Sequence, residues 1–136
     1  FWIVFDRVEG EGKHHVESRF QFAPCELRRD GSRVTTTHDD ANLLLWACPS
    51  SPFSDIHIEA GQENPKGGWY SPSYGRIRPA PAISLSLETL LPFATATLLF
   101  PYRGSVSAPV NFSYENTVAT IASEETGTLH IETTLV

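Results

Sequence analysis

The sequence predicts an all-β protein, an antiparallel two-sheet β-sandwich in one domain over residues 1–136. Three observations support this prediction. About ten short segments are either apolar throughout or alternate apolar with polar residues, as strands do. Turn signals recur at intervals of roughly 8–12 residues, which is typical of sandwiches and barrels. Ten prolines and nine glycines punctuate the chain, and no stretch has the periodicity of an amphipathic helix.

The first half of the chain contains six expected strands. Residues 1–8 start apolar in both phases, which indicates burial on two sides. Residues 14–22 alternate and form a hairpin with residues 1–8 that has one solvated face. Asp30-Gly31 is a strong hairpin-turn signal. The strands expected in this half are 1–8, 14–22, 26–29, 33–37, 42–48 and 55–60, and the apolar strand 42–48 is expected to be buried.

The second half of the chain shows the same pattern of short strands separated by turns. Ile83, Leu85 and Leu87 alternate with serines, which predicts a strand with one apolar face. Pro92 then breaks the chain before a strand rich in threonine and alanine. The strands expected in this half are 82–87, 93–100, 111–114, 117–123 and 129–135.

Charge and hydropathy exclude two classes of partner. The net charge of −6 argues against nucleic-acid binding, which normally requires a basic face. No apolar run approaches the length of a membrane span, so no membrane association is expected. The chain begins with strand-like sequence and contains no methionine. We therefore expect its natural start to lie upstream of Phe1.

Cysteines, histidines and acidic residues form no pattern that predicts a metal, a cofactor or a catalytic centre. Cys25 and Cys48 are either a disulfide or two ordinary thiols. Adjacent His14 and His15 on a strand point to opposite faces and cannot chelate one ion. The turn at 38–40 offers oxygens for Ca²⁺ or is simply solvated. Asp6 interrupts an apolar strand, so its carboxylate needs an arginine or a backbone donor as partner.

Residues 67–81 are the most informative stretch for function. They hold three aromatic rings, two arginines, three glycines and three prolines. They lack apolar alternation, which predicts an irregular loop rather than a strand. Aromatic faces pack against the C–H faces of sugars, and arginines pair two-pronged with carboxylates or sulfates. The segment is either a glycan-contacting loop or an aromatic cap on the end of the sandwich.

Three regions resemble the heparinase II/III-like polysaccharide lyases. Val4-Phe5-Asp6-Arg7-Val8-Glu9-Gly10, followed by residues 15–22 and Ala23-Pro24, is similar to one motif of that family. Gly68-Trp69-Tyr70-Ser71 with Tyr74-Gly75 is similar to a later one. Leu91-Pro92 and the segment 97–101 resemble the region that follows. The resemblance covers residues 1–103 in the same order.

The resemblance implies a division of labour. Such lyases have an N-terminal helical toroid and a C-terminal antiparallel β-sandwich, and they cleave uronic-acid-containing glycans, such as glycosaminoglycans or alginate, by β-elimination. The reacting residues come mainly from the toroid, so this chain would be a non-catalytic sandwich whose first strands precede Phe1. The position of a histidine often seen in the second-strand motif is occupied here by Gln21, or by its neighbours Phe20 and Phe22, which argues against the zinc site of some members. A bacterial, periplasmic or secreted location is implied as well.

The expected partners are an acidic polysaccharide and the helical toroid. Five residues are the candidate substrate contacts: Trp69, Tyr70, Tyr74, Arg76 and Arg78. A free-standing carbohydrate-binding module and a purely structural interaction domain remain alternatives. Exposed strand edges also invite pairing with another copy of the chain.

Overall fold

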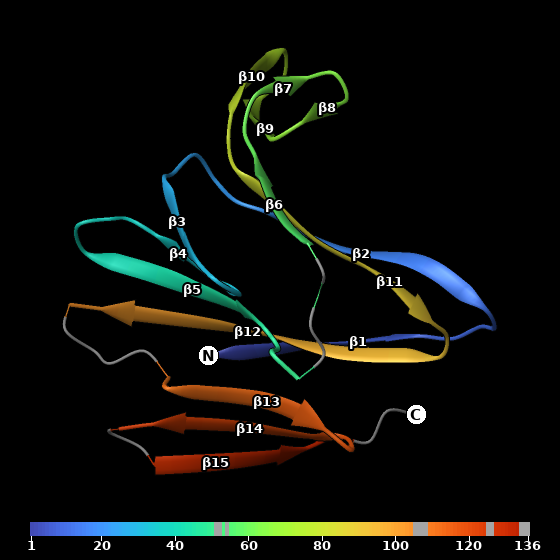
Figure 1. Ribbon diagram of the computed structural model, residues 1–136. Coiled ribbons are helices and arrows are strands. Elements are labelled where there is room, and N and C mark those ends of the chain that lie inside the picture. The colour runs from blue at the N-terminus through green and yellow to red at the C-terminus, as the bar shows by residue number, and fades with distance from the viewer. Residues whose placement is uncertain (51–52, 54, 105–108, 125–126, 134–136) are drawn as a thin grey trace.

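Three antiparallel sheets are stacked as layers in the computed structural model, and two short hairpins lie at one end (Figure 1). The structure describes residues 1–50, 53, 55–104, 109–124 and 127–133. These residues form fifteen strands and no helix. The described part of the chain therefore has no helix that is long and apolar enough to cross a membrane.

The middle layer is a five-stranded sheet in the order β1-β12-β5-β4-β3. Leu44 and Trp46 of β5 point to one side of this sheet, and Leu45 and Ala47 point to the other. Because other sheets cover both faces, β5 is apolar in both phases. The predicted buried strand at 42–48 is thus confirmed. The five strands are Trp2–Val8 (β1), Phe93–Arg103 (β12), Ala41–Ala47 (β5), Arg33–Thr36 (β4) and Leu27–Asp30 (β3).

The second layer is a three-stranded sheet in the order β2-β11-β6. Its strands are Lys13–Gln21 (β2), Ala82–Leu90 (β11) and Asp55–Glu59 (β6). The predicted hairpin between residues 1–8 and 14–22 is wrong, because β2 pairs with β11 while β1 pairs with β12 in the middle layer. Ile83 and Leu85 are fully buried against the middle sheet, where they pack with Val34, Leu45 and Ile56. The alternation of β11 therefore places its serines on the outer face, as the sequence predicts.

The third layer covers the opposite face of the middle sheet. It consists of Asn111–Glu115 (β13), Val118–Ser123 (β14) and Gly127–Glu132 (β15). The ring of Phe112 lies 5.9 Å from that of Trp46, and Tyr114 lies 5.3 Å from Phe5. The Ser50 hydroxyl accepts from the Tyr114 amide at 3.0 Å and donates to its carbonyl at 3.1 Å. These two bonds tie β13 to the chain that follows β5.

The predicted all-β antiparallel sandwich is confirmed, and the third layer adds to the two sheets that were expected. Its physical cause lies in the middle sheet. Leu44, Trp46 and Leu98 form an apolar second face there, and burying such a face stabilises the fold by about 25 cal/mol per Å². Phe112 and Ile121 of the third sheet supply the cover.

The segment 67–81 differs from its prediction as an irregular loop. It contains the end of β8 (Lys66–Gly67), which pairs with β7 (Gln62–Glu63), and it then forms β9 (Trp69–Ser73) and β10 (Arg76–Pro79). The prediction failed because main-chain hydrogen bonds hold a hairpin without an apolar face. This hairpin projects from the sandwich, and residues 71–79 are all exposed.

The structure also decides between the alternatives for the cysteines and for Asp6. Cys25 and Cys48 are both free thiols. Burial raises the pKa of the Cys25 thiol, which keeps it protonated and a weak nucleophile. The Asp6 carboxylate accepts a hydrogen bond from the Ser18 hydroxyl at 3.1 Å. Its partner is thus a side-chain hydroxyl rather than the expected arginine or backbone donor.

Candidate functional site

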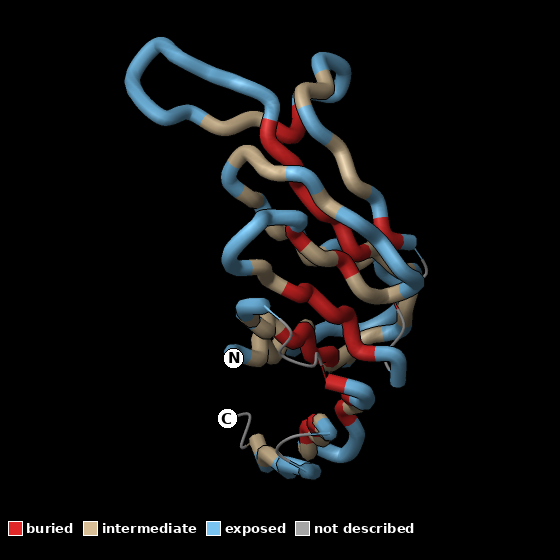
Figure 2. The backbone as a smooth tube through the Cα atoms, turned by 90° about the vertical axis from the view of Figure 1, so that its left-hand side faces the viewer, coloured by how far each residue is buried: buried red, intermediate tan, exposed pale blue. Residues whose placement is uncertain are grey.

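The β9–β10 hairpin carries all five predicted contact residues. Tyr70 pairs with Arg78 and Trp69 pairs with Pro79, with a register shift nearer the tip. The turn at Tyr74-Gly75 places Gly75 at a φ of 72°, a conformation that favours glycine. Figure 2 shows an exposed hairpin tip that extends beyond the buried core. The hairpin thus presents its side chains to solvent on a well-paired backbone.

Two buried glycines form the base of this hairpin. Gly68 has a φ of 69°, and its carbonyl accepts hydrogen bonds from the amides of Gly61 (2.8 Å) and Ala80 (2.9 Å). A Cβ on Gly68 would lie 2.6 Å from the Cα of Ala60, which is far inside van der Waals contact. A side chain on Gly67 would overlap the carboxylate of Glu59. The chain therefore enters the hairpin in close contact with the end of β6, and at Gly68, where a side chain would overlap backbone, only glycine fits.

Trp69 is anchored at the start of β9. Its indole Nε1 donates to the carbonyl of Gln62 at 2.9 Å, and the ring remains partly exposed. The Lys66 ammonium lies 5.7 Å from the centre of this ring, within the range of a cation–π contact. The ring is therefore held in a fixed orientation beside a positive charge.

Tyr70 and Arg78 form a second aromatic–cation pair. The guanidinium carbon of Arg78 lies 5.5 Å from the centre of the Tyr70 ring, directly across the two strands. Tyr70 is partly buried and Arg78 is exposed. Trp69 with Lys66 and Tyr70 with Arg78 therefore form two aromatic–cation pairs on opposite faces of the hairpin base, since consecutive strand residues point to opposite sides.

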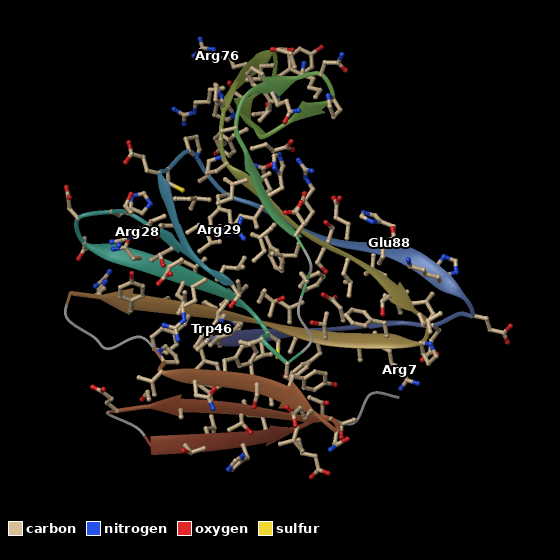
Figure 3. All side chains as sticks on the ribbon, viewed as in Figure 1. Arg7, Arg28, Arg29, Trp46, Arg76 and Glu88 are labelled. Carbon is tan, nitrogen blue, oxygen red and sulfur yellow. The ribbon has the colours of Figure 1, made fainter. Side chains whose placement is uncertain are left out.

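Tyr74 and Arg76 lie apart from that group, at the tip. Tyr74 is fully exposed, and Arg76 flanks the turn (Figure 3). An open hollow next to the turn is lined by Pro72, Gly75, Arg76, Ile77 and Arg78. The hairpin therefore offers stacking faces and guanidinium groups along its length, an arrangement suited to binding an extended anionic chain.

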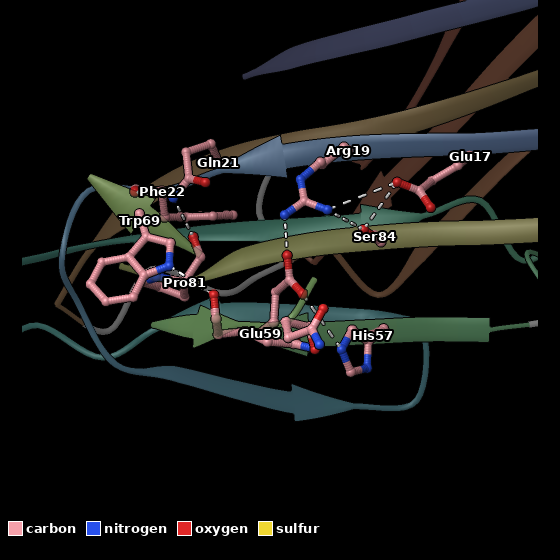
Figure 4. A network of polar contacts seen from close by, with 11 residues as sticks. Glu17, Arg19, Gln21, Phe22, His57, Glu59, Trp69, Pro81 and Ser84 are labelled. Atoms are coloured by element: carbon pink, nitrogen blue, oxygen red, sulfur yellow. Dashed lines mark hydrogen bonds and ion pairs between the residues drawn. The ribbon is translucent and has the colours of Figure 1, made fainter. Parts of the chain in front are cut away.

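A polar network that sequence reasoning missed adjoins the base of the hairpin (Figure 4). The Arg19 guanidinium pairs with the Glu59 carboxylate and donates to the Ser84 hydroxyl at 3.3 Å. Ser84 in turn donates to Glu17 at 3.3 Å. The His57 Nε2 lies 4.0 Å from the second oxygen of Glu59. Only the strand register shows this cluster, because its members come from β2, β11 and β6.

Gln21 stands where the resemblance leads us to expect a histidine, and its side chain hydrogen-bonds main-chain carbonyls. Its Nε2 donates to the carbonyls of Phe22 (3.0 Å) and Pro81 (3.1 Å). Among the described residues, no three His, Cys, Asp or Glu side chains gather as a metal site requires. In the turn at 38–40, Asp40 lies 3.8 Å from the Arg103 guanidinium, and both side chains are exposed.

Replacing Arg19 by methionine is expected to lower the free energy of unfolding by about 1–2 kcal/mol. The Glu59 side chain is only 10% exposed and would lose its charged partner, although the 43% exposure of Arg19 keeps the loss small. Urea unfolding measures it. The double variant Arg19→Met/Glu59→Gln should recover at least half of the loss. An equal or larger loss in the double variant would show that the pair does not stabilise the fold.

The family described as heparinase II/III-like, C-terminal, matches residues 1–124. The chain belongs to the heparinase II/III-like C-terminal family. All three motif regions of the sequence lie within the matched residues: the first on β1 and β2, the second at the start of the β9–β10 hairpin, and the third at β12 and just before it.

A solved structure supports the fold of this heparinase II/III-like C-terminal domain. The crystal structure of a heparan sulfate lyase HepC mutant from Pedobacter heparinus matches it with a TM-score of 0.72 and 18% sequence identity. The match covers 96% of this chain and 21% of that lyase, so the chain spans about a fifth of the larger protein. At this identity the likeness shows the fold. No curated protein matches the sequence.

Proposed function

We propose that this domain is the accessory, non-catalytic β-sandwich of a lyase that cleaves uronic-acid-containing polysaccharides by β-elimination. In this proposal the β9–β10 hairpin contacts the acidic chain. Membership of the heparinase II/III-like C-terminal family supports the general class. The similar solved structure is described as a heparan sulfate lyase, which favours a glycosaminoglycan over alginate.

The observation that carries the binding role is the local charge of the hairpin region. Residues 62–79 contain three cations (Lys66, Arg76 and Arg78) and one carboxylate (Glu63), a local charge of 3 − 1 = +2 in a chain of net charge −6. Two of these cations lie over aromatic rings, Lys66 over Trp69 and Arg78 over Tyr70. A positive, aromatic surface on an acidic protein is suited to an anionic sugar chain.

The chemistry agrees with an accessory role. β-Elimination requires a base for the C5 proton of the uronate, a group that neutralises the developing enolate, and an acid for the leaving oxygen. Tyr74 is fully exposed at the tip, so surrounding side chains do not hold its phenol in the single orientation that proton transfer requires. We therefore assign the reacting groups to the helical toroid and binding to the hairpin.

Replacing Trp69 or Arg76 by alanine is expected to weaken binding of a heparan sulfate oligosaccharide. Loss of the Trp69 stacking face should cost about 1–3 kcal/mol, and loss of the Arg76 guanidinium about 1 kcal/mol. Isothermal titration calorimetry at low and moderate salt measures both effects. Added salt should weaken binding to the unmodified protein, because exposed charges are screened.

Arg7→Ala is the matched control for Arg76→Ala. Both arginines are exposed, but Arg7 pairs with Glu9 and lies far from the hairpin (Figure 3). Affinity should be unchanged in the Arg7 variant. If both arginine variants lose affinity equally, binding reflects overall charge, and the hairpin assignment is wrong. Complete absence of glycan binding would favour a purely structural interaction domain.

The alternative function, a free-standing carbohydrate-binding module, would use the same hairpin. Its affinity for the glycan would not depend on a helical toroid, whereas that of an accessory domain would. Adding the helical part of a lyase should then leave the affinity for the glycan unchanged, whereas the accessory role predicts tighter binding and β-elimination. Association with a second copy and a periplasmic or secreted location remain predictions from the sequence.

A further inference from the structure

A polar groove lies on the middle sheet, on the face opposite to the second layer. Its volume is about 510 Å³, and its lining includes Arg28, Asp30, Arg33, Thr35, His38 and Tyr102. Register fixes the face on which these side chains lie. Arg33 stands opposite Trp46, and Thr35 stands opposite Leu44. Trp46 and Leu44 pack against the third layer, so the groove opens beside that layer, over β3, β4 and β5.

Arg33 forms the rigid floor of the groove. Its guanidinium carbon lies 3.8 Å from the centre of the Trp46 ring, which is only 4% exposed. The Trp46 indole is fixed in turn by donating to the Ser32 hydroxyl at 3.1 Å. Stacking occupies the flat face of the guanidinium and leaves its N–H edges free, the geometry in which arginine binds a carboxylate or sulfate two-pronged.

Asp30 stands opposite Arg33 on the β3–β4 hairpin, but neither arginine of the groove forms an ion pair with a described carboxylate. Arg28 stands opposite Thr35 and Arg33 opposite Asp30, so the two arginines are diagonal neighbours on one face of the hairpin, roughly 7–8 Å apart at the backbone. An anionic group between them would receive donors from both.

The end of the groove is built of fixed hydrogen bonds. The Asn42 side chain accepts from the Thr36 hydroxyl (3.1 Å) and the His38 amide (2.7 Å), and donates to the His38 carbonyl (2.9 Å). This clamp positions the turn that carries His38 and Asp39 at the groove. The Thr35 and Tyr102 hydroxyls and the Asp30 carboxylate add the mixed donors and acceptors that sugar hydroxyls require.

We propose that this groove binds one carboxylate- or sulfate-bearing sugar unit. Arg33 and Arg28 pair with its anionic group, and Asp30 with the threonine and tyrosine hydroxyls binds its ring hydroxyls. The groove is a second contact for the acidic polysaccharide, separate from the hairpin, and it rests on the proposed function only for the identity of that polymer. Two contacts on one long chain raise the retention of the polymer beyond either alone.

The test uses a heparan sulfate tetrasaccharide and the full chain, with binding followed at the indole signals of Trp46 and Trp69 by NMR. Binding in the groove should shift the Trp46 signal, because the Arg33 guanidinium lies on that ring. Arg33→Lys keeps the charge but loses the planar guanidinium. The affinity measured at the Trp46 signal should therefore fall about tenfold. Arg28→Ala should weaken it several-fold. Since the Arg28 side chain is exposed, this variant is expected to fold normally.

The outcomes separate this proposal from the proposed function. A Trp69 response without a Trp46 response overturns the groove and leaves the hairpin in place. A Trp46 response without a Trp69 response supports the groove and overturns the hairpin. If Arg28→Ala and Arg33→Lys leave the affinity measured at the Trp46 signal unchanged, the groove does not bind the sugar.

Discussion

Gly68→Ala is expected to lower the free energy of unfolding by about 2–4 kcal/mol and to weaken glycan binding as well. A residue with a side chain at a φ of 69° is strained by about 1–2 kcal/mol. Its Cβ would also lie 2.6 Å from the Cα of Ala60 and 2.7 Å from the carbonyl oxygen of Glu59, so backbone must move. Because the Gly68 carbonyl binds the amides of Gly61 and Ala80, that movement loosens the base of the hairpin.

Gly75→Ala is the matched control. Gly75 has nearly the same φ, 72°, but a Cβ there would meet nothing within 4 Å. Its variant should show the backbone strain alone, about 1–2 kcal/mol. Urea unfolding of both variants therefore separates strain from overlap. Equal losses in the two would mean that Gly68 is not packed against β6 as described.

Phe112→Ala is expected to destabilise the protein by about 3–5 kcal/mol. Phe112 is 1% exposed and packs on Trp46 at the contact between the third layer and the middle sheet. Its removal leaves a cavity that the paired strands on either side cannot fill. Urea unfolding followed by tryptophan fluorescence measures the loss, since Trp46 reports on this contact.

Leu129→Ala on β15 serves as the control for Phe112→Ala. Leu129 is 47% exposed, so its truncation should change stability by less than about 1 kcal/mol. A similarly small effect for Phe112→Ala would show that the third layer does not fold cooperatively with the rest. Separate unfolding transitions by fluorescence and circular dichroism would lead to the same conclusion.

The parts of the fold that could be predicted are those in which the local pattern determines the structure. The apolar run of β5 predicted a buried strand, and the alternation of β11 predicted its one apolar face. Asp30-Gly31 predicted the β3–β4 hairpin, in which Gly31 has a φ of 58°. In each case the pattern of residues adjacent in the sequence was enough to predict the local structure.

The rest depends on contacts between residues far apart in sequence. The sequence predicted strands at 111–114 and 117–123 but not which sheet they would cover. The β9–β10 hairpin carries no apolar pattern because it has no core to face. The five contact residues were found by composition, whereas the Arg19–Glu59 pair and the Arg33–Trp46 stack became visible only through cross-strand register.

The β9–β10 hairpin is the surface that we propose meets the acidic polysaccharide. An NMR titration of the isotope-labelled chain with a heparan sulfate tetrasaccharide tests it most directly, because the three tryptophans report on separate regions. Trp69 lies on the hairpin, Trp46 beneath the groove, and Trp2 on β1, away from both. We predict saturable chemical-shift changes at the Trp69 indole and at the amides of residues 69–79, with the Trp2 indole signal unchanged. Shifts that leave the hairpin unmoved, or equal shifts at Trp2 and Trp69, would contradict it.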